Sequence, residues 1–161
     1  MQHFHKFSVS AAILLFPLIL SSCGNSKVNE MKQYKEEMES FFTAMDTYED
    51  SLLLMDMNSE DAGEKILDTL TGMNEEILAA SGTDHPEEYV NVQLMLEQSS
   101  EYMTDAVSYM QRAEEGDADA YDVAFSNYEK AMERIDYAIT FLHGEVPEGV
   151  TMSSGEEVSG D

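Results

Sequence analysis

A seven-residue hydrophobic repeat near the start of the chain constrains its fold more than any other feature. Between residues 31 and 55, large apolar side chains recur every seven positions, and a second series follows three residues behind the first. Side chains with this spacing form one continuous stripe along an α-helix, and such a stripe has to pack against other helices. The two series are Met31, Met38, Met45 and Leu52, and Tyr34, Phe41, Tyr48 and Met55.

A second helical pattern runs from about Ser59 to Ala80, with Ile66, Leu70, Met73 and Ile77 on one face. Its start offers residues that cap a helix or favour the positive end of the helix dipole. Two glycines inside the pattern are unfavourable in a helix, so we expect this helix to be the least stable. The start residues are Asn58, Ser59, Glu60 and Asp61, and the glycines are Gly63 and Gly72.

Two more helical patterns follow, separated by residues typical of helix ends. We expect Gly82 to end the second helix in a left-handed conformation and Pro86 to begin the third. Gly116 is expected to end the third helix and Asp117 to cap the fourth, which Gly144 is expected to end. The third pattern contains Tyr89, Leu96, Met103 and Met110 with Val92, Ser99, Ala106 and Ala113. The fourth contains Tyr121, Tyr128, Ile135 and Leu142 with Ala124, Ala131 and Ala138, widened by Phe125, Met132 and Ile139.

These patterns predict an all-α fold, because no segment alternates like a β-strand. Short connections favour antiparallel neighbours, so the expected architecture over residues 31–144 is an up-down-up-down four-helix bundle. A three-helix bundle is the fallback if the first two helices fuse or the second frays. Residues 145–161 lack periodicity and are expected to form a disordered acidic tail.

The beginning of the chain has the features of an export signal. Lys6 precedes an apolar stretch, Val9 to Leu20, which is shorter than the ~20 residues needed to cross a bilayer. Leu20-Ser21-Ser22-Cys23 resembles the lipobox of bacterial lipoproteins. The resemblance implies that residues 1–22 are a cleaved signal peptide and that Cys23 carries a diacylglyceryl thioether. Residues 23–30 would then be a short tether holding the domain at the extracytoplasmic face of the cell membrane.

Two segments, "YKEEMESFF" (residues 34–42) and "FLHGEVPEG" (residues 141–149), also resemble parts of a group of small helical lipoproteins from anaerobic Gram-positive bacteria. This resemblance supports a lipid-anchored helical domain. It implies no catalytic residues and no cofactor.

The charge of the chain limits its partners. It contains 33 acidic residues and 8 lysines or arginines, a formal net charge of −25 at pH 7. Nucleic acid is excluded as a partner because its binding depends on basic residues that neutralise phosphates. A basic envelope protein, a cationic peptide or a second copy of the chain are the partners that we expect. The oligomeric state is left open.

The sequence contains no motif for a catalytic or cofactor site. Glu-x-x-His, Cys-x-x-Cys-His and His-Glu-x-x-His are all absent, so signatures for di-iron, attached haem and zinc are missing. His85 is interpreted as part of a turn and His143 as a cation at a helix C-terminus. A calcium loop beginning at Asp117 fails because Asp122 occupies the place that requires glycine. We therefore expect no enzyme activity and no cofactor.

The resulting expectation is a non-enzymatic interaction module on a lipid anchor. The alternative is an extracytoplasmic cation-binding protein, which would hold Ca²⁺ on acidic helix faces or Cu⁺ on methionine thioethers. The acidic faces are predicted to point to solvent, and most methionines are predicted to fill the core. The residues concerned are Glu97, Glu101 and Asp105, then Glu129 and Glu133, and the close pair Met55 and Met57.

Overall fold

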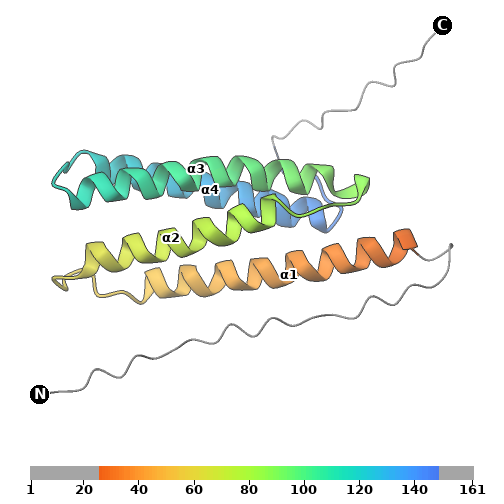
Figure 1. The fold of residues 1–161 in the computed structure, drawn as a ribbon, viewed down its shortest axis with the longest axis horizontal. Helices are drawn as coiled ribbons and strands as arrows, with labels where there is room; N and C mark the ends of the chain where they lie inside the picture. Colours follow the sequence, from red (N-terminus) through yellow and green to blue (C-terminus); the bar gives the residue numbers. More distant parts are fainter. Residues whose placement is uncertain (1–25, 149–161) are drawn as a thin grey trace, which may run out of the picture.

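The computed structural model describes residues 26–148, and these residues form a bundle of four α-helices (Figure 1). Successive helices run in opposite directions and pack in sequence order, so the prediction of an up-down-up-down four-helix bundle is confirmed. The first two helices are separate. The elements are α1 (Ser26–Leu53), α2 (Ala62–Ser81), the 3₁₀ helix η1 (Glu87–Tyr89), α3 (Val90–Glu114) and α4 (Ala120–Leu142).

The four helices are not packed equally tightly. The α3–α4 pair shares the most extensive interface, α2 packs on α3, and α1 packs mainly on α2. Contact between α1 and α4 is sparse, so the bundle has one open side. This unequal packing leaves a cavity between α1 and α4.

The predicted hydrophobic stripes form the core. Tyr34, Met38, Phe41 and Met45 of α1 are buried, and the remaining members of that stripe are half-buried. Leu96, Met103 and Met110 of the third stripe are fully buried, as is Ile135 of the fourth. Six of the ten methionines within residues 26–148 are buried, which confirms that most of them fill the core. They are Met38, Met45, Met73, Met95, Met103 and Met110.

The boundaries of α1 differ from the prediction. The helix begins at Ser26, not at Met31, so the last residues of the expected tether are helical. It ends at Leu53, before the predicted stripe is complete at Met55. The heptad pattern could not locate the first turns, because residues 26–30 are exposed and carry no stripe side chain.

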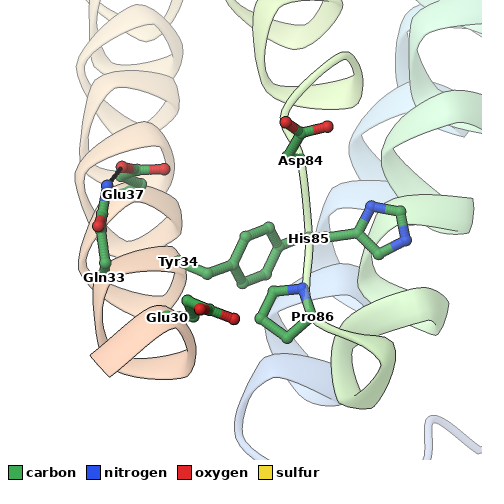
Figure 2. Close-up of a pocket in the computed structure, with 7 residues that line it drawn as sticks. All are labelled: Glu30, Gln33, Tyr34, Glu37, Asp84, His85 and Pro86. Carbon is green, nitrogen blue, oxygen red and sulfur yellow. Dashed lines mark hydrogen bonds between the residues drawn. The ribbon is translucent and has the colours of Figure 1, made fainter. Parts of the chain in front are cut away.

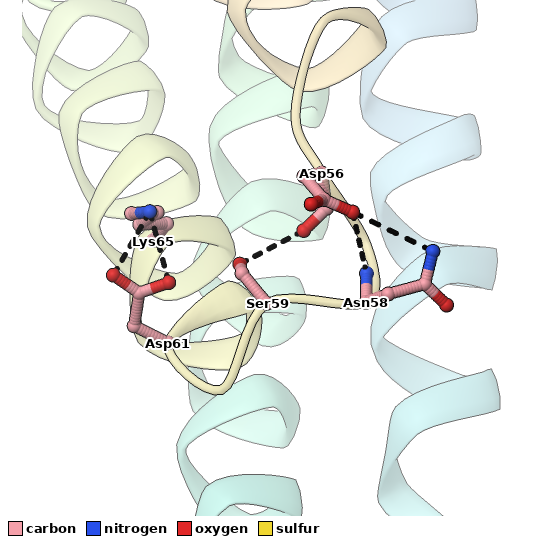
Figure 3. A network of polar contacts seen from close by, with 5 residues as sticks. All are labelled: Asp56, Asn58, Ser59, Asp61 and Lys65. Carbon is pink, nitrogen blue, oxygen red and sulfur yellow. Dashed lines mark hydrogen bonds and ion pairs between the residues drawn. The ribbon is translucent and has the colours of Figure 1, made fainter.

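The predicted cap of α2 is wrong. The helix begins at Ala62 with Asp61 at the cap position, and no side chain caps it. Figure 3 shows why: the Ser59 hydroxyl donates to the backbone carbonyl of Asp56 at 2.8 Å, and the backbone N–H of Asn58 donates to the Asp56 carboxylate at 3.0 Å. The Asp61 carboxylate is held by Lys65 at 2.9 Å. The polar side chains of this turn therefore have partners within the turn or on Lys65, and none caps the free N–H groups at the start of α2.

Two of the three glycines expected at helix ends behave as predicted. Gly116 and Gly144 have φ of +105° and +81°, a conformation that favours glycine. Gly82 ends α2 but has a φ of −93°, so the predicted left-handed conformation is wrong there. The predicted cap Asp117 is also wrong: α4 begins at Ala120, three residues beyond it, with Asp119 at the cap position.

The carboxylate of Asp117 accepts a hydrogen bond from Arg112 at 2.6 Å, which takes it away from any capping role. Pro86 has extended backbone angles and precedes η1, so α3 itself starts later, at Val90. In the segment expected to be a disordered tail, Pro147 is buried, and residues 149–161 lie outside the described part of the chain.

Gln93 joins three elements at the end of the bundle that contains the start of α1. Its side-chain oxygen accepts a hydrogen bond from the Tyr34 hydroxyl at 3.3 Å, and its amide nitrogen donates to the carbonyl of Ala80 at 3.3 Å. The same nitrogen also donates to the carbonyl of Ser81. Because Gln93 and Tyr34 are both buried, these bonds satisfy polar groups that water does not reach.

Candidate functional site

The open side of the bundle contains a groove between the C-terminal half of α1 and the N-terminal half of α4. Its cavity measures about 560 Å³, which is within the range of ligand-binding pockets. We call it the α1–α4 groove. Its lining residues are Asp46, Glu49, Asp50, Leu52, Leu53, Phe125 and Tyr128.

One end of the groove is apolar because consecutive leucines stand at the end of α1 and only one of them lies on the hydrophobic stripe. Leu52 lies on the stripe and is half-buried, whereas Leu53 is 81% exposed and Leu54 is 86% exposed. Met57, in the following turn, is also exposed. Exposed large apolar side chains that adjoin a cavity are typical of an interaction surface.

The other end of the groove is acidic, and a single hydrogen bond crosses it. The Tyr128 hydroxyl of α4 donates to the Glu49 carboxylate of α1 at 3.3 Å. Burial raises the pKa of Glu49 above its usual value, and the negative charges of Asp136 and Asp46 raise it further, although the bond from Tyr128 opposes them. Burial and the charge of Asp46 likewise raise the pKa of Asp136 on α4. Carboxylates of the two helices therefore repel each other across the groove.

The chain's own basic residues do not neutralise these acids. Among residues 26–148, five lysines or arginines form ion pairs, and none of these pairs includes a carboxylate that lines the groove. On α4, Arg134 pairs with Glu133, and Lys130 lies 5.6 Å above the ring of Tyr102 on α3. The groove acids are consequently left without a counter-charge from this part of the protein.

A smaller notch of about 270 Å³ lies at the opposite end of α1, beside His85. Figure 2 shows Tyr34 reaching from α1 toward Pro86, whereas the His85 ring extends away from α1. The Tyr34 and His85 rings are 6.5 Å apart, and Tyr34 stacks on Tyr89 at 5.0 Å. Burial raises the pKa of Tyr34 to about 12, and its hydroxyl is bonded to Gln93. The notch thus has an exposed imidazole and nearby acids, but its tyrosine is buried in the core and hydrogen-bonded there to Gln93.

The structure does not bring candidate metal ligands together. Within residues 26–148, no group of three or more His, Cys, Asp or Glu side chains is placed to hold a metal ion. The acidic ladders of α3 and α4 are exposed, as expected for a solvated outer face. Met55 is half-buried and Met57 is exposed in the α1–α2 connection, and His143 is an exposed residue at the end of α4.

Cys23, the predicted lipid attachment site, and the predicted signal peptide lie outside the described residues. None of the helices between residues 26 and 148 has the length and hydropathy required to span a bilayer. Comparisons with protein families, with characterised proteins and with solved structures give no match for this chain.

The α1–α4 groove was not predicted from the sequence. The heptad pattern indicates which side chains turn inward, but it does not tell which pair of helices stays apart. The available signal was the run Leu52-Leu53-Leu54, because three consecutive residues of a helix cannot all face the same core.

Proposed function

We propose that the protein is a lipoprotein of the extracytoplasmic membrane face and acts as a non-enzymatic binding module. The α1–α4 groove carries this proposal, because it combines a cavity, exposed leucines and unpaired acids in one place. An apolar surface with a polar rim is the usual composition of a protein-binding site. The lipobox resemblance of residues 20–23 supports the anchor.

The anchor is tested by comparing the full chain with a Cys23→Ser variant in the native host. We expect the parent protein to partition into detergent and its N-terminal peptide to carry lipid in mass spectrometry. The variant should lose both properties. An unmodified Cys23 on protein released to the medium would refute the anchor.

Binding is tested by photocrosslinking on intact cells. A photoreactive amino acid at position 53 stands at the edge of the groove, and the same residue at position 101 stands on the exposed outer face of α3 as a matched control. We expect a defined crosslinked product from position 53 and none from position 101.

Equal products from the two positions would contradict a specific binding role for the groove. Calorimetry with Ca²⁺ and Cu⁺ completes the test. Tight stoichiometric binding of either ion, with no crosslinked partner, would favour the cation-binding alternative over the proposed function.

A further inference from the structure

The shape of the α1–α4 groove suits a helical partner. α1 and α4 run antiparallel (Figure 1), and all residues that line the groove come from these two helices. Residues 26–148 contain helices and turns but no strand, so in this part of the chain no sheet edge is available to pair with an extended peptide. Insertion of an amphipathic helix between two helices is the recognition mode that this surface offers.

The groove has two ends of different chemistry. The apolar end lies at the C-terminus of α1, and the acidic end lies about one to two helical turns before it. From Asp46 to Leu53 the rise along the helix is about 10 Å. A partner therefore needs apolar side chains and cations within roughly two turns of each other. The apolar end consists of Leu52, Leu53 and Phe125, and the acidic end of Asp46, Glu49 and Asp50.

The acidic end lacks an internal counter-charge. None of the five ion pairs among residues 26–148 includes a groove carboxylate. Among the same residues, the side-chain hydrogen bond that a groove carboxylate accepts comes from the neutral Tyr128. Asp136 adds a further negative charge from α4. Lysine or arginine side chains of a partner would relieve this repulsion, and repulsion would disfavour an acidic partner.

We propose that the α1–α4 groove binds a basic amphipathic helix. The apolar side chains of the helix pack on the apolar end, and its lysines or arginines pair with the acidic end. This inference rests on the proposed function, because it names the class of partner for the same groove.

The test uses the full chain in phosphatidylcholine nanodiscs and a fluorescent peptide of about 18 residues, with leucines at helical spacing and lysines elsewhere. The control peptide has the same composition in scrambled order, so it has the same charge without an apolar face. We expect the amphipathic peptide to bind in fluorescence anisotropy and the scrambled peptide to bind at least about tenfold more weakly. Empty nanodiscs give the lipid background.

Two variants with the same charge change locate the binding site. The groove variant combines Asp46→Asn, Glu49→Gln and Asp50→Asn. The outer-face variant combines Glu97→Gln, Glu101→Gln and Asp105→Asn, all on exposed positions of α3. We expect the groove variant to weaken peptide binding about tenfold and the outer-face variant to change it less than about twofold.

The apolar end is tested by Leu53→Ser, with Leu78→Ser as the control. Both leucines are exposed, at 81% and 49%, so neither substitution empties the core. We expect Leu53→Ser to weaken binding about fivefold or more and Leu78→Ser to leave it unchanged. Circular dichroism of each variant verifies that the helices are retained.

Four outcomes would overturn the inference. The first is equal loss of binding in the two charge variants, and the second is equal binding of the two peptides. The third is Leu53-dependent binding of the chain to added lipid vesicles in place of the peptide, and the fourth is a Leu53-dependent dimer that excludes the peptide. A crosslinked partner at position 53 without a basic helix would overturn this inference alone, whereas an unmodified Cys23 would overturn the anchor alone.

Discussion

The hydrogen bond between Gln93 and Tyr34 provides a sharp test of how the bundle is held together at one end. We expect Gln93→Met to keep the length of the side chain while it removes the amide. The substitution leaves the buried Tyr34 hydroxyl without its partner, whereas the Ala80 carbonyl keeps the N–H of Thr83 at 3.2 Å. A buried polar group that loses its partner costs about 1–3 kcal/mol, so Gln93→Met should lower the free energy of unfolding by about 1–3 kcal/mol.

The Tyr34→Phe variant removes the same hydrogen bond from its other side, at a cost of about 1 kcal/mol. The double variant has no hydroxyl left without a partner. Its loss of unfolding free energy should therefore be about 1 kcal/mol smaller than the sum of the two single losses. Urea unfolding of the full chain, followed by circular dichroism at the helix band, measures all three values. Unchanged slopes of the unfolding curves would show that the comparison is between similar unfolded states.

A matched control is the pair Tyr34→Phe and Ser99→Ala. The Ser99 hydroxyl is fully buried and donates to the carbonyl of Ala131 on α4 at 2.9 Å, so it shares no partner with Tyr34. These two losses should add within about 0.5 kcal/mol. Additive losses for Gln93→Met and Tyr34→Phe as well would refute the coupling that we derive from the structure.

Three further predictions concern the core, the turns and pH. Met103→Ala should lower the free energy of unfolding by about 2–5 kcal/mol because Met103 is fully buried, whereas Met57→Ala should change it by less than about 0.5 kcal/mol; urea unfolding measures both. Gly116→Ala should cost about 1–2 kcal/mol, since its φ is +105°, and the same change at Gly82, with φ −93°, should be tolerated in thermal unfolding. The raised pKa of Glu49 means that the folded state keeps its proton to higher pH than the unfolded state, so this group lowers stability as the pH rises through the range just above the ordinary pKa of a glutamate. Glu49→Gln should therefore flatten the pH dependence of the unfolding midpoint in that range, and an unchanged dependence would contradict the raised pKa.

The hydrophobic repeats were sufficient to predict the four helices and most of the core. Leu96, Met103 and Met110 recur every seven residues, and all three are buried, because helix periodicity and burial are linked by geometry alone. Helix starts were harder to predict. Ser59 and Asp117 have good capping side chains, but each finds another partner nearby, and the sequence does not rank these local alternatives.

The groove and the Gln93 junction depend on how helices meet, which a periodic pattern does not specify. Gln93 is satisfied in its buried position because the end of α2 presents two carbonyls to its amide nitrogen and Tyr34 donates to its oxygen. The second glycine of α2 has a similar explanation. A Cβ atom at Gly72 would come within 2.9 Å of the Tyr48 ring, so the residue that looked unfavourable in a helix allows α1 to pack closely on α2.

The length of α1 has a mechanical consequence. This helix of 28 residues spans about 42 Å, with the predicted lipid attachment just before its first turn and the apolar end of the groove at its last. With Cys23 lipidated as proposed, a pull on a docked partner would pass to the membrane along one continuous helix. The tightly packed α3–α4 pair would lie beside that line of force and not within it. α1, which has the weakest contacts to the rest of the bundle, would then be the element that tension detaches first.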